Sequence, residues 1–264
     1  MQYADIANGV PYVAVPPEHE RADAPVVVAW HLADPPRSET ALAAALPLAG
    51  LDAWRIYLGL PMHSSRSIDP DEYLRLAYED AVVNHFGPIT EQASAEFPAT
   101  YAALADRFEL AGPLALLGGS LGSAVAQLVA INRDDVVAEV LISPVAMLRA
   151  IVAVNEHRFD VSYRWHPAAT EIADRLDFVA RAEETARTAP AVRLIVGERD
   201  DIAVRESATE LHEALAKRYA DPTRADLVTV PDMPHALADQ NEQPLPHAAT
   251  VDRLAAEWLQ RHLP

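Results

Sequence analysis

Cysteine is absent from the 264 residues of this chain. That absence excludes disulfide bonds, thiolate ligands for metals and a cysteine nucleophile. Long apolar runs are absent too, since no window holds the roughly 18 uninterrupted apolar residues of a membrane-spanning helix. The first residues, Met-Gln-Tyr-Ala-Asp-Ile, contain no basic segment followed by an apolar run, so no secretory signal is expected. Together these absences predict a cytoplasmic protein that does not enter a membrane.

Positive charge is also scarce. The chain has 21 lysines and arginines against 39 aspartates and glutamates, and Lys217 is its single lysine. A formal charge of −18 argues against nucleic acid or an anionic membrane as a partner, because both bind basic surfaces. The acidic residues are scattered, which is typical of a solvated surface. Histidine and aspartate form no cluster with the spacing of a metal site, so we expect neither a metal nor another cofactor.

Short apolar runs alternate with helix-like segments, a pattern typical of an α/β protein with parallel strands. The first two runs are joined by Asn8-Gly9, a strong hairpin signal, and are therefore expected to pair antiparallel. We predict one domain over residues 1–264, with a mostly parallel eight-stranded sheet flanked by helices. The predicted strands cover residues 2–7, 11–15, 25–30, 54–60, 114–117, 138–142, 192–196 and 227–230.

Helices are expected between these strands and at the end of the chain. A break is expected near Gly87-Pro88 in the longest helical segment, and Pro98 is a further candidate break. The predicted helical segments cover residues 38–48, 70–107, 121–132 and 248–262.

The segment 149–189 does not fit this alternation. It contains Phe159, Tyr163 and Trp165, followed by a helical stretch over residues 168–188. Its length fits a small lid inserted after the sixth strand, which would cover a pocket at the carboxyl ends of the strands. In that position Trp165 and Tyr163 would supply apolar surface for the substrate. The alternative is an ordinary connecting helix with a longer loop, whose aromatic residues pack onto the sheet.

Glycine is scarce, with nine residues in the chain, yet three of them surround one serine. Gly118-Gly119-Ser120-Leu121-Gly122 matches Gly-x-Ser-x-Gly, with a predicted strand before it and a predicted helix after it. That is the context of a nucleophile elbow, in which small residues let strand and helix approach and the helix N-terminus favours negative charge. The alternative is a helix-capping serine with glycines for close packing. A phosphate-binding loop fits poorly, because no lysine lies nearby.

The groups that would activate Ser120 follow in the order that this type of fold requires. A serine hydroxyl is a poor nucleophile unless a base takes its proton and an acid orients that base. The acids Glu198, Asp200 and Asp201 directly follow one predicted strand, and His235 follows the next. Taken singly, an acid after a strand or a histidine in a loop is ordinary. Their joint occurrence in this order predicts a site for nucleophilic catalysis.

On these residues the sequence resembles the α/β-hydrolase superfamily over nearly its whole length. Residues 197–204, Gly-Glu-Arg-Asp-Asp-Ile-Ala-Val, look like the family segment Gly-Glu-x-Asp-x-x-Val, which implies that the triad acid is Asp200. The resemblance further implies Ser120 as the nucleophile and His235 as the base. The overall order of these residues looks most similar to that of serine esterases of the dienelactone-hydrolase and prolyl-oligopeptidase-like branches. True dienelactone hydrolases carry a cysteine nucleophile, which this chain lacks.

The chain departs from the family pattern after the third predicted strand. Members commonly carry His-Gly there, and the following backbone amide helps to form the oxyanion hole, whereas here His31 is followed by Leu32. The resemblance implies a hole formed by the amide of Leu121 and that of Ala33 or Leu32, and a structural role for His31. Residues 61–66, Pro-Met-His-Ser-Ser-Arg, look similar to another family loop, which implies that they are architectural or line the edge of the pocket.

The function that these residues predict is a serine hydrolase that cleaves a carboxylic ester, or a similar acyl bond, in a small molecule. A peptidase or an acyltransferase would use the same triad, because a fold does not determine its substrate. A binding protein without catalysis is the third interpretation, supported by the missing glycine at Leu32. The sequence leaves the oligomeric state open.

Overall fold

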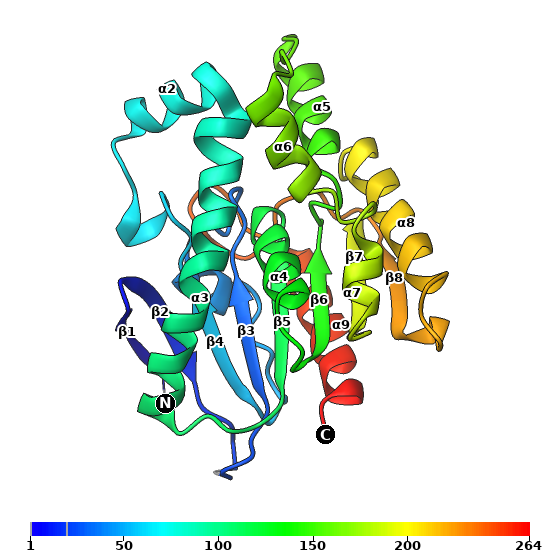
Figure 1. Cartoon of the computed structure of the whole chain (residues 1–264). Helices are drawn as coiled ribbons and strands as arrows, with labels where there is room; N and C mark the ends of the chain where they lie inside the picture. Colours follow the sequence, from blue (N-terminus) through cyan, green and yellow to red (C-terminus); the bar gives the residue numbers. More distant parts are fainter. Residues whose placement is uncertain (1, 20) are drawn as a thin grey trace.

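An eight-stranded sheet forms the centre of the computed structural model, which describes residues 2–19 and 21–264 (Figure 1). Its strand order is β1-β2-β4-β3-β5-β6-β7-β8. Strand β2 pairs antiparallel with β1 and β4, and the remaining pairings are parallel. Each strand lies within two residues of its predicted bounds, so the predicted fold class is confirmed. The strands are β1 (Tyr3–Ala7), β2 (Val10–Val15), β3 (Val26–Trp30), β4 (Trp54–Leu58), β5 (Leu114–Gly119), β6 (Val136–Ile142), β7 (Ala191–Gly197) and β8 (Ala225–Val230).

The hairpin between β1 and β2 turns on two residues with positive φ, Asn8 at 48° and Gly9 at 80°. Two-residue turns of this kind match the twist of the flanking strands.

Strand β3 is buried along its whole length, because helices cover both faces of the sheet. Apolar side chains on the two faces form two core clusters, one against each layer of helices.

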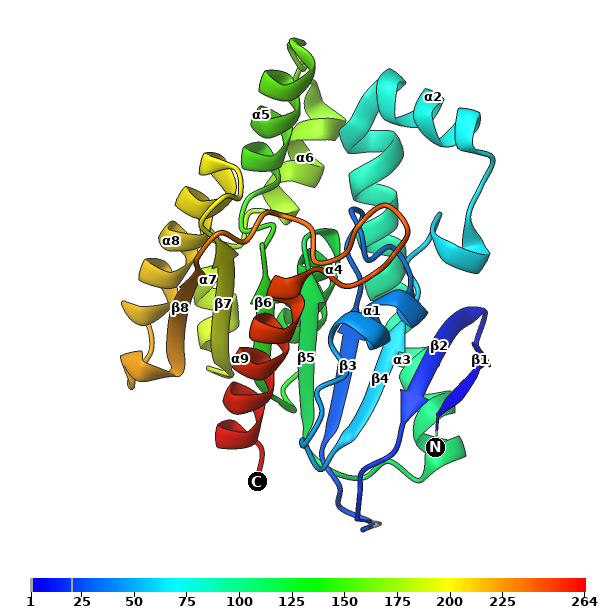
Figure 2. The same ribbon diagram turned by 180° about the vertical axis from the view of Figure 1, so that it is seen from behind.

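The helices form a layer on each side of the sheet. Helices α1 (Glu39–Ala45) and α9 (Pro246–His262) cover one face, which is turned to the front in Figure 2. Helices α3 (Gly87–Phe108), α4 (Leu121–Ile131), α7 (Ala182–Ala186) and α8 (Ile202–Ala216) cover the other. All residues of α4 are buried, because this helix lies at the middle of the sheet. Short 3-10 turns, η1 (Ser64–Arg66) and η3 (Pro222–Arg224), complete the connections.

The segment predicted to be helical over residues 70–107 consists of two α-helices with a π-helical turn between them. Helix α2 (Pro70–Asp80) is followed by a π-helical turn, η2 (Ala81–Phe86), and then by α3. The break expected near Gly87-Pro88 is wrong in position, because the backbone leaves the helical conformation at Asp80 (φ −163°, ψ 97°) and Gly87 is helical. The break expected at Pro98 is wrong, because this proline lies inside α3. Pro98 is exposed, so water can hydrate the carbonyl that its missing N–H leaves without a partner.

The segment after β6 rises above the carboxyl ends of the strands and packs beside α2 and η2 (Figure 1). It begins with α5 (Leu148–Phe159), a helix that we did not predict from the sequence. The helical stretch expected over 168–188 forms two pieces, α6 (Pro167–Arg175) and α7. The turn between them places Leu176 and Phe178 in the core. No helix in the described part of the chain is long and apolar enough to span a membrane.

Candidate active site

Ser120 lies at the sharp turn between β5 and α4. Its backbone has φ 46° and ψ −117°, a conformation that costs free energy for a residue with a side chain. The two flanking glycines permit the turn: a Cβ on Gly118 would lie 2.3 Å from the Gly122 carbonyl oxygen, and one on Gly122 would lie 2.4 Å from that of Trp30. Strand and helix therefore touch backbone to backbone beneath Ser120. This is the geometry of the predicted elbow.

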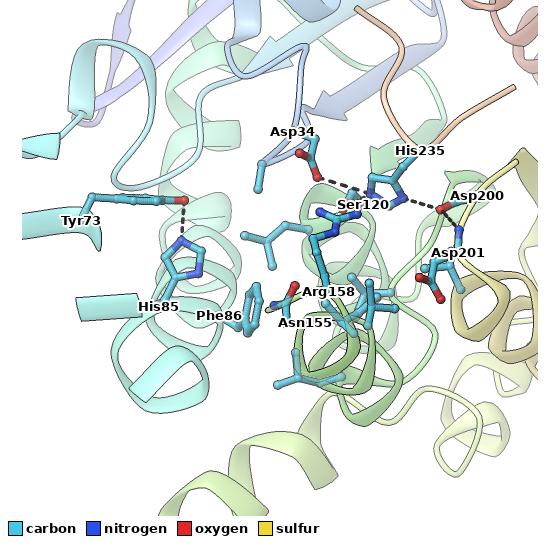
Figure 3. A pocket seen from close by; sticks show the side chains of 17 residues that line it. Asp34, Tyr73, His85, Phe86, Ser120, Asn155, Arg158, Asp200, Asp201 and His235 are labelled. Carbon is cyan, nitrogen blue, oxygen red and sulfur yellow. Dashed lines mark hydrogen bonds and ion pairs between the residues drawn. The ribbon is translucent and has the colours of Figure 1, made fainter. Parts of the chain in front are cut away.

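Three side chains from three loops form one hydrogen-bonded chain (Figure 3). The Ser120 hydroxyl lies 2.9 Å from Nε2 of His235, and Nδ1 of His235 lies 2.8 Å from Oδ1 of Asp200. The Asp200 side chain is fully buried, whereas His235 keeps about a fifth of its side chain exposed. The structure thus brings together the three residues that the sequence singled out for catalysis.

The three acids after β7 have separate positions. Asp200 Oδ1 accepts hydrogen bonds from His235 and from the backbone amide of Asp201 at 2.8 Å. Asp201 caps the N-terminus of α8 by accepting from the amide of Ala203 at 3.0 Å. Glu198 accepts from the backbone of the loop after β8. Asp200 is accordingly the acid that contacts the histidine.

Two loops far apart in the sequence are joined at the site. The Pro35 carbonyl, in the loop after β3, accepts a hydrogen bond from the amide of Leu237 at 3.0 Å. Arg37 donates both its backbone N–H and its Nε to the Glu242 carboxylate, each at 2.9 Å. The loop that contains His235 is thereby held against the loop that follows β3.

Charges around His235 affect its protonation. Burial alone lowers the pKa of the imidazole, but the hydrogen bond and charge of Asp200 and the charge of Asp34 outweigh it, so the pKa is raised. Arg158 acts in the opposite direction and lowers this pKa. Asp34 Oδ2 lies 3.9 Å from Nε2. Burial raises the pKa of the Asp200 carboxyl, yet the His235 contacts and the nearby Ser143 hydroxyl hold it below its ordinary value.

The backbone amides beside Ser120 include free donors. The amide of Leu121 starts α4, where the first amides have no acceptor within the helix. The Leu32 amide donates to the Pro36 carbonyl at 3.2 Å, so it is already occupied. The Ala33 amide donates no hydrogen bond within the described residues. Of the two amides proposed to complete an oxyanion hole, Ala33 is the one available.

Leu32 is accommodated in the core beside the loop after β3. Its side chain is fully buried and packs against Gly119, where a Cβ would lie 2.3 Å from Leu32 Cδ1. His31 fixes the same loop: Nδ1 donates to the Leu32 carbonyl at 2.7 Å, and Nε2 accepts from the Leu60 amide at 3.0 Å. Burial lowers the pKa of His31 to about 3, so the ring stays neutral. These contacts fit the structural role expected for His31.

Ser120 opens into a cavity of about 230 Å³ (Figure 3). Helix α5 supplies one wall, and Arg158 of this helix reaches toward Ser120 and His235. Residues of α2 and η2 supply another wall. The residues that line the cavity from these helices are Leu148, Ile151, Val154, Asn155 and Arg158 of α5, Tyr73 of α2, and His85 and Phe86 of η2.

Trp165 and Tyr163, which we predicted to contact the substrate, do not line this cavity. Tyr163 donates its hydroxyl to Asp80 Oδ1 at 2.5 Å and packs edge-on against Trp165, with ring centres 4.9 Å apart. Helix α5 provides the wall beside Ser120, and Tyr163 instead lines a second, adjoining hollow beside α2. Within the segment 149–189, it is α5 that faces Ser120.

Sequence reasoning missed several residues around Ser120. Asp34 follows Ala33 in the same loop, so its place beside the site was implied by the position of its neighbour. Arg158 and Phe86 carry no such signal, because only the packing of α5 and η2 over the sheet brings them to the cavity.

Burial lowers the pKa of His85 to about 4, and its Nε2 lies 2.5 Å from the Tyr73 hydroxyl.

Among the residues that the structure describes, no group of three or more His, Asp or Glu side chains is arranged to hold a metal ion.

Comparisons with known proteins agree with this architecture. No protein-family model and no curated protein matches the chain. A protein of Thermus thermophilus of known structure is similar, with 18% identity, a TM-score of 0.69, and coverage of 99% of this chain and 97% of that one. A dienelactone hydrolase of Anabaena variabilis has 14% identity, a TM-score of 0.60, and coverage of 100% and 99%.

An acylaminoacyl peptidase of Pyrococcus horikoshii is also similar, with 12% identity and a TM-score of 0.67. The match covers the whole of this chain but 41% of the peptidase. At such identities the likeness concerns the fold, and it extends over the complete sheet and both helical layers. With its strand order and its serine turn between β5 and α4, the chain has the α/β-hydrolase fold.

Proposed function

We propose that this protein is a serine hydrolase that cleaves carboxylic esters of small molecules. The observation that carries the proposal is the hydrogen-bonded chain from Ser120 through His235 to the buried Asp200, at 2.9 and 2.8 Å. The serine is presented by a strained turn and faces a cavity lined by both apolar and polar side chains. Nucleophile, base and orienting acid are the three groups that acyl transfer requires.

The reaction begins with proton transfer from Ser120 to Nε2 of His235 while Oγ attacks the ester carbonyl. Asp200 holds Nδ1 and stabilises the imidazolium that forms. The developing oxyanion would accept hydrogen bonds from the amides of Leu121 and Ala33, and each such donor typically contributes about 3–4 kcal/mol to the transition state. His235 then gives its proton to the leaving alcohol. Water, activated by the same histidine, releases the acid.

The test combines labelling and turnover. A fluorophosphonate probe should label the wild-type protein at Ser120, and p-nitrophenyl acetate should be hydrolysed. Ser120→Ala should remove labelling and reduce kcat by about 10⁴-fold or more, because triad members act as a unit. Ser94→Ala, on α3 outside the cavity, is the control and should behave as wild type. Near-normal turnover by Ser120→Ala would refute the assignment.

Peptide-bond cleavage is the second candidate, since one of the similar structures is an acylaminoacyl peptidase. The same three groups serve amides, so the discriminating measurement is a set of p-nitroanilide substrates beside the matching p-nitrophenyl esters. The binding-protein interpretation loses its main support, because Leu32 packs into the core and leaves the Ala33 amide available. A protein without catalysis would show neither probe labelling nor turnover.

A further inference from the structure

A second hollow of about 550 Å³ adjoins the Ser120 cavity. It lies between α2 with η2 on one side and α5 with the loop 160–166 on the other. The two spaces share His85, Phe86 and Asn155 as lining residues. Figure 3 shows Phe86 and Asn155 on the same side of the Ser120 cavity. The second hollow therefore begins at side chains that also line the Ser120 cavity.

Exposed apolar side chains are concentrated around this hollow. In the described part of the chain, six large apolar side chains are more than half exposed, and four of them line it: Leu74, Tyr78, Phe159 and Val161. Tyr78 is 78% exposed and Phe159 57%. None of these four residues belongs to either core cluster. Exposed apolar side chains that gather around a hollow mark a site that an apolar group covers.

The hollow is a built feature, because hydrogen bonds tie its two sides together. Asp80, at the end of α2, accepts from the Tyr163 hydroxyl at 2.5 Å and contacts Nε2 of His166 at 2.7 Å. The same carboxylate caps η2 through the amides of Val82 and Val83. One side chain thus joins the loop 160–166 to the helices opposite and fixes the width of the space between them.

We propose that this hollow receives an apolar arm of the ester that Ser120 cleaves, so that the substrate class is esters with an extended aliphatic or aromatic part. The inference rests on the proposed function and adds the substrate's shape to it. Continuity with the Ser120 cavity selects the substrate as the occupant. Each further methylene group should then add binding free energy, because its burial against the apolar lining removes apolar surface from water.

The experiment measures kcat/KM for two ester series. One lengthens the acyl chain of p-nitrophenyl esters from acetate to decanoate, and the other lengthens the alcohol of acetate esters. In the series whose variable part enters the hollow, kcat/KM should rise about fourfold for each methylene group until the space is filled. The series that rises identifies the arm as acyl or alcohol.

Variants that fill the hollow test its part in this rise. Ala77→Trp on α2, and separately Ser162→Trp in the opposite loop, should lower the ratio of decanoate to acetate kcat/KM at least tenfold. Ala103→Trp, an exposed alanine of α3 outside the hollow, is the matched control and should keep the wild-type ratio. Circular dichroism and Tm show whether each variant is folded, and the two filling variants come from different segments.

The outcomes separate this inference from the proposed function. Acetate-ester turnover that depends on Ser120, with no dependence on chain length in either series, would overturn the apolar arm and leave the hydrolase standing. A rise that persists in both filling variants would also overturn it. Absence of turnover for every ester would refute the proposed function itself.

Discussion

The adjacent acids at positions 200 and 201 have different contacts and are expected to have different roles. The Asp200 carboxylate is buried against His235, whereas that of Asp201 caps α8. Asp200→Asn should reduce kcat by about 10⁴-fold, since the histidine is then left in the wrong tautomer. Asp201→Asn should keep most of the activity, because asparagine also caps helices. Steady-state kinetics on p-nitrophenyl acetate give the comparison, and similar losses in both variants would move the triad acid elsewhere.

Two charged residues at the rim of the cavity should shift the pH profile in opposite directions. The pKa of His235 is lowered by burial and raised by its contact with Asp200. The charge of Asp34 raises this pKa further, and the charge of Arg158 lowers it. A general base works in its neutral form, so activity falls as pH drops through this pKa. Asp34→Asn should therefore move the acid limb of kcat/KM to lower pH, and Arg158→Gln should move it to higher pH.

The measurement is kcat/KM from pH 5 to 9 for the two variants and the wild type at constant ionic strength. Opposite displacements support both assignments, because a general loss of stability would affect the variants alike. Displacements of the same sign would show that neither charge acts on the histidine as its position indicates.

At the scale of elements, the turn between β5 and α4 leaves no room for added side-chain atoms at its glycines. Gly122→Ala would place a Cβ 2.4 Å from a backbone oxygen of β3, which cannot move without disturbing the sheet. We expect a loss of about 1–3 kcal/mol in the free energy of unfolding, as for other overpacked sites. Ser120→Ala is the comparison, since it keeps the backbone and should lose activity without this loss of stability. Urea denaturation measures both.

The elements that the sequence predicts well are those with a local signal. Strand β3 is a short β-branched run, and the turn around Ser120 has glycines at the positions where strand and helix touch. Helix α5 was missed because its residues serve two purposes: Leu148 and Val152 pack into the core, whereas the polar Asn155 and Arg158 line the cavity. A helix shared between core and site lacks a clean amphipathic pattern.

For the molecule as a whole, a buried carboxyl links stability to pH. Glu139 lies in β6 and is 1% exposed, and burial raises its pKa to about 8 from an ordinary value of 4.5. Between these values the folded chain holds a proton that the unfolded chain releases. Stability should therefore fall as pH rises from about 4.5 to about 8, by at most about 1.4 kcal/mol for each pH unit from this group.

Glu139→Gln removes this dependence. The variant should gain stability relative to the wild type as pH rises from 5 to 8, in urea denaturation at each pH. Glu210→Gln, at an exposed position of α8, is the control and should follow the wild-type curve. Parallel curves for the wild type and Glu139→Gln would show that Glu139 is ionised in the folded protein.

The order of residues along the chain sufficed to predict the pairing of Ser120 with Asp200 and His235, because the carboxyl ends of neighbouring parallel strands meet at one edge. It did not suffice for the walls of the cavity. Trp165 was chosen for its size and segment, yet its neighbours are Tyr163 and Arg149 on the far side of α5. The orientation of a segment above the sheet depends on long-range contacts such as those of Asp80, which no local pattern contains.

The bonds between the loop after β3 and the loop after β8 have a mechanical consequence. The Ala33 amide and His235 belong to segments about 200 residues apart, yet Pro35 bonds to Leu237, two residues beyond the histidine. The amide proposed to hold the oxyanion and the histidine proposed as the base therefore belong to two loops that hydrogen bonds join, including those of Arg37 with Glu242. A displacement of either loop should move the other, so charge stabilisation and proton transfer should be lost together.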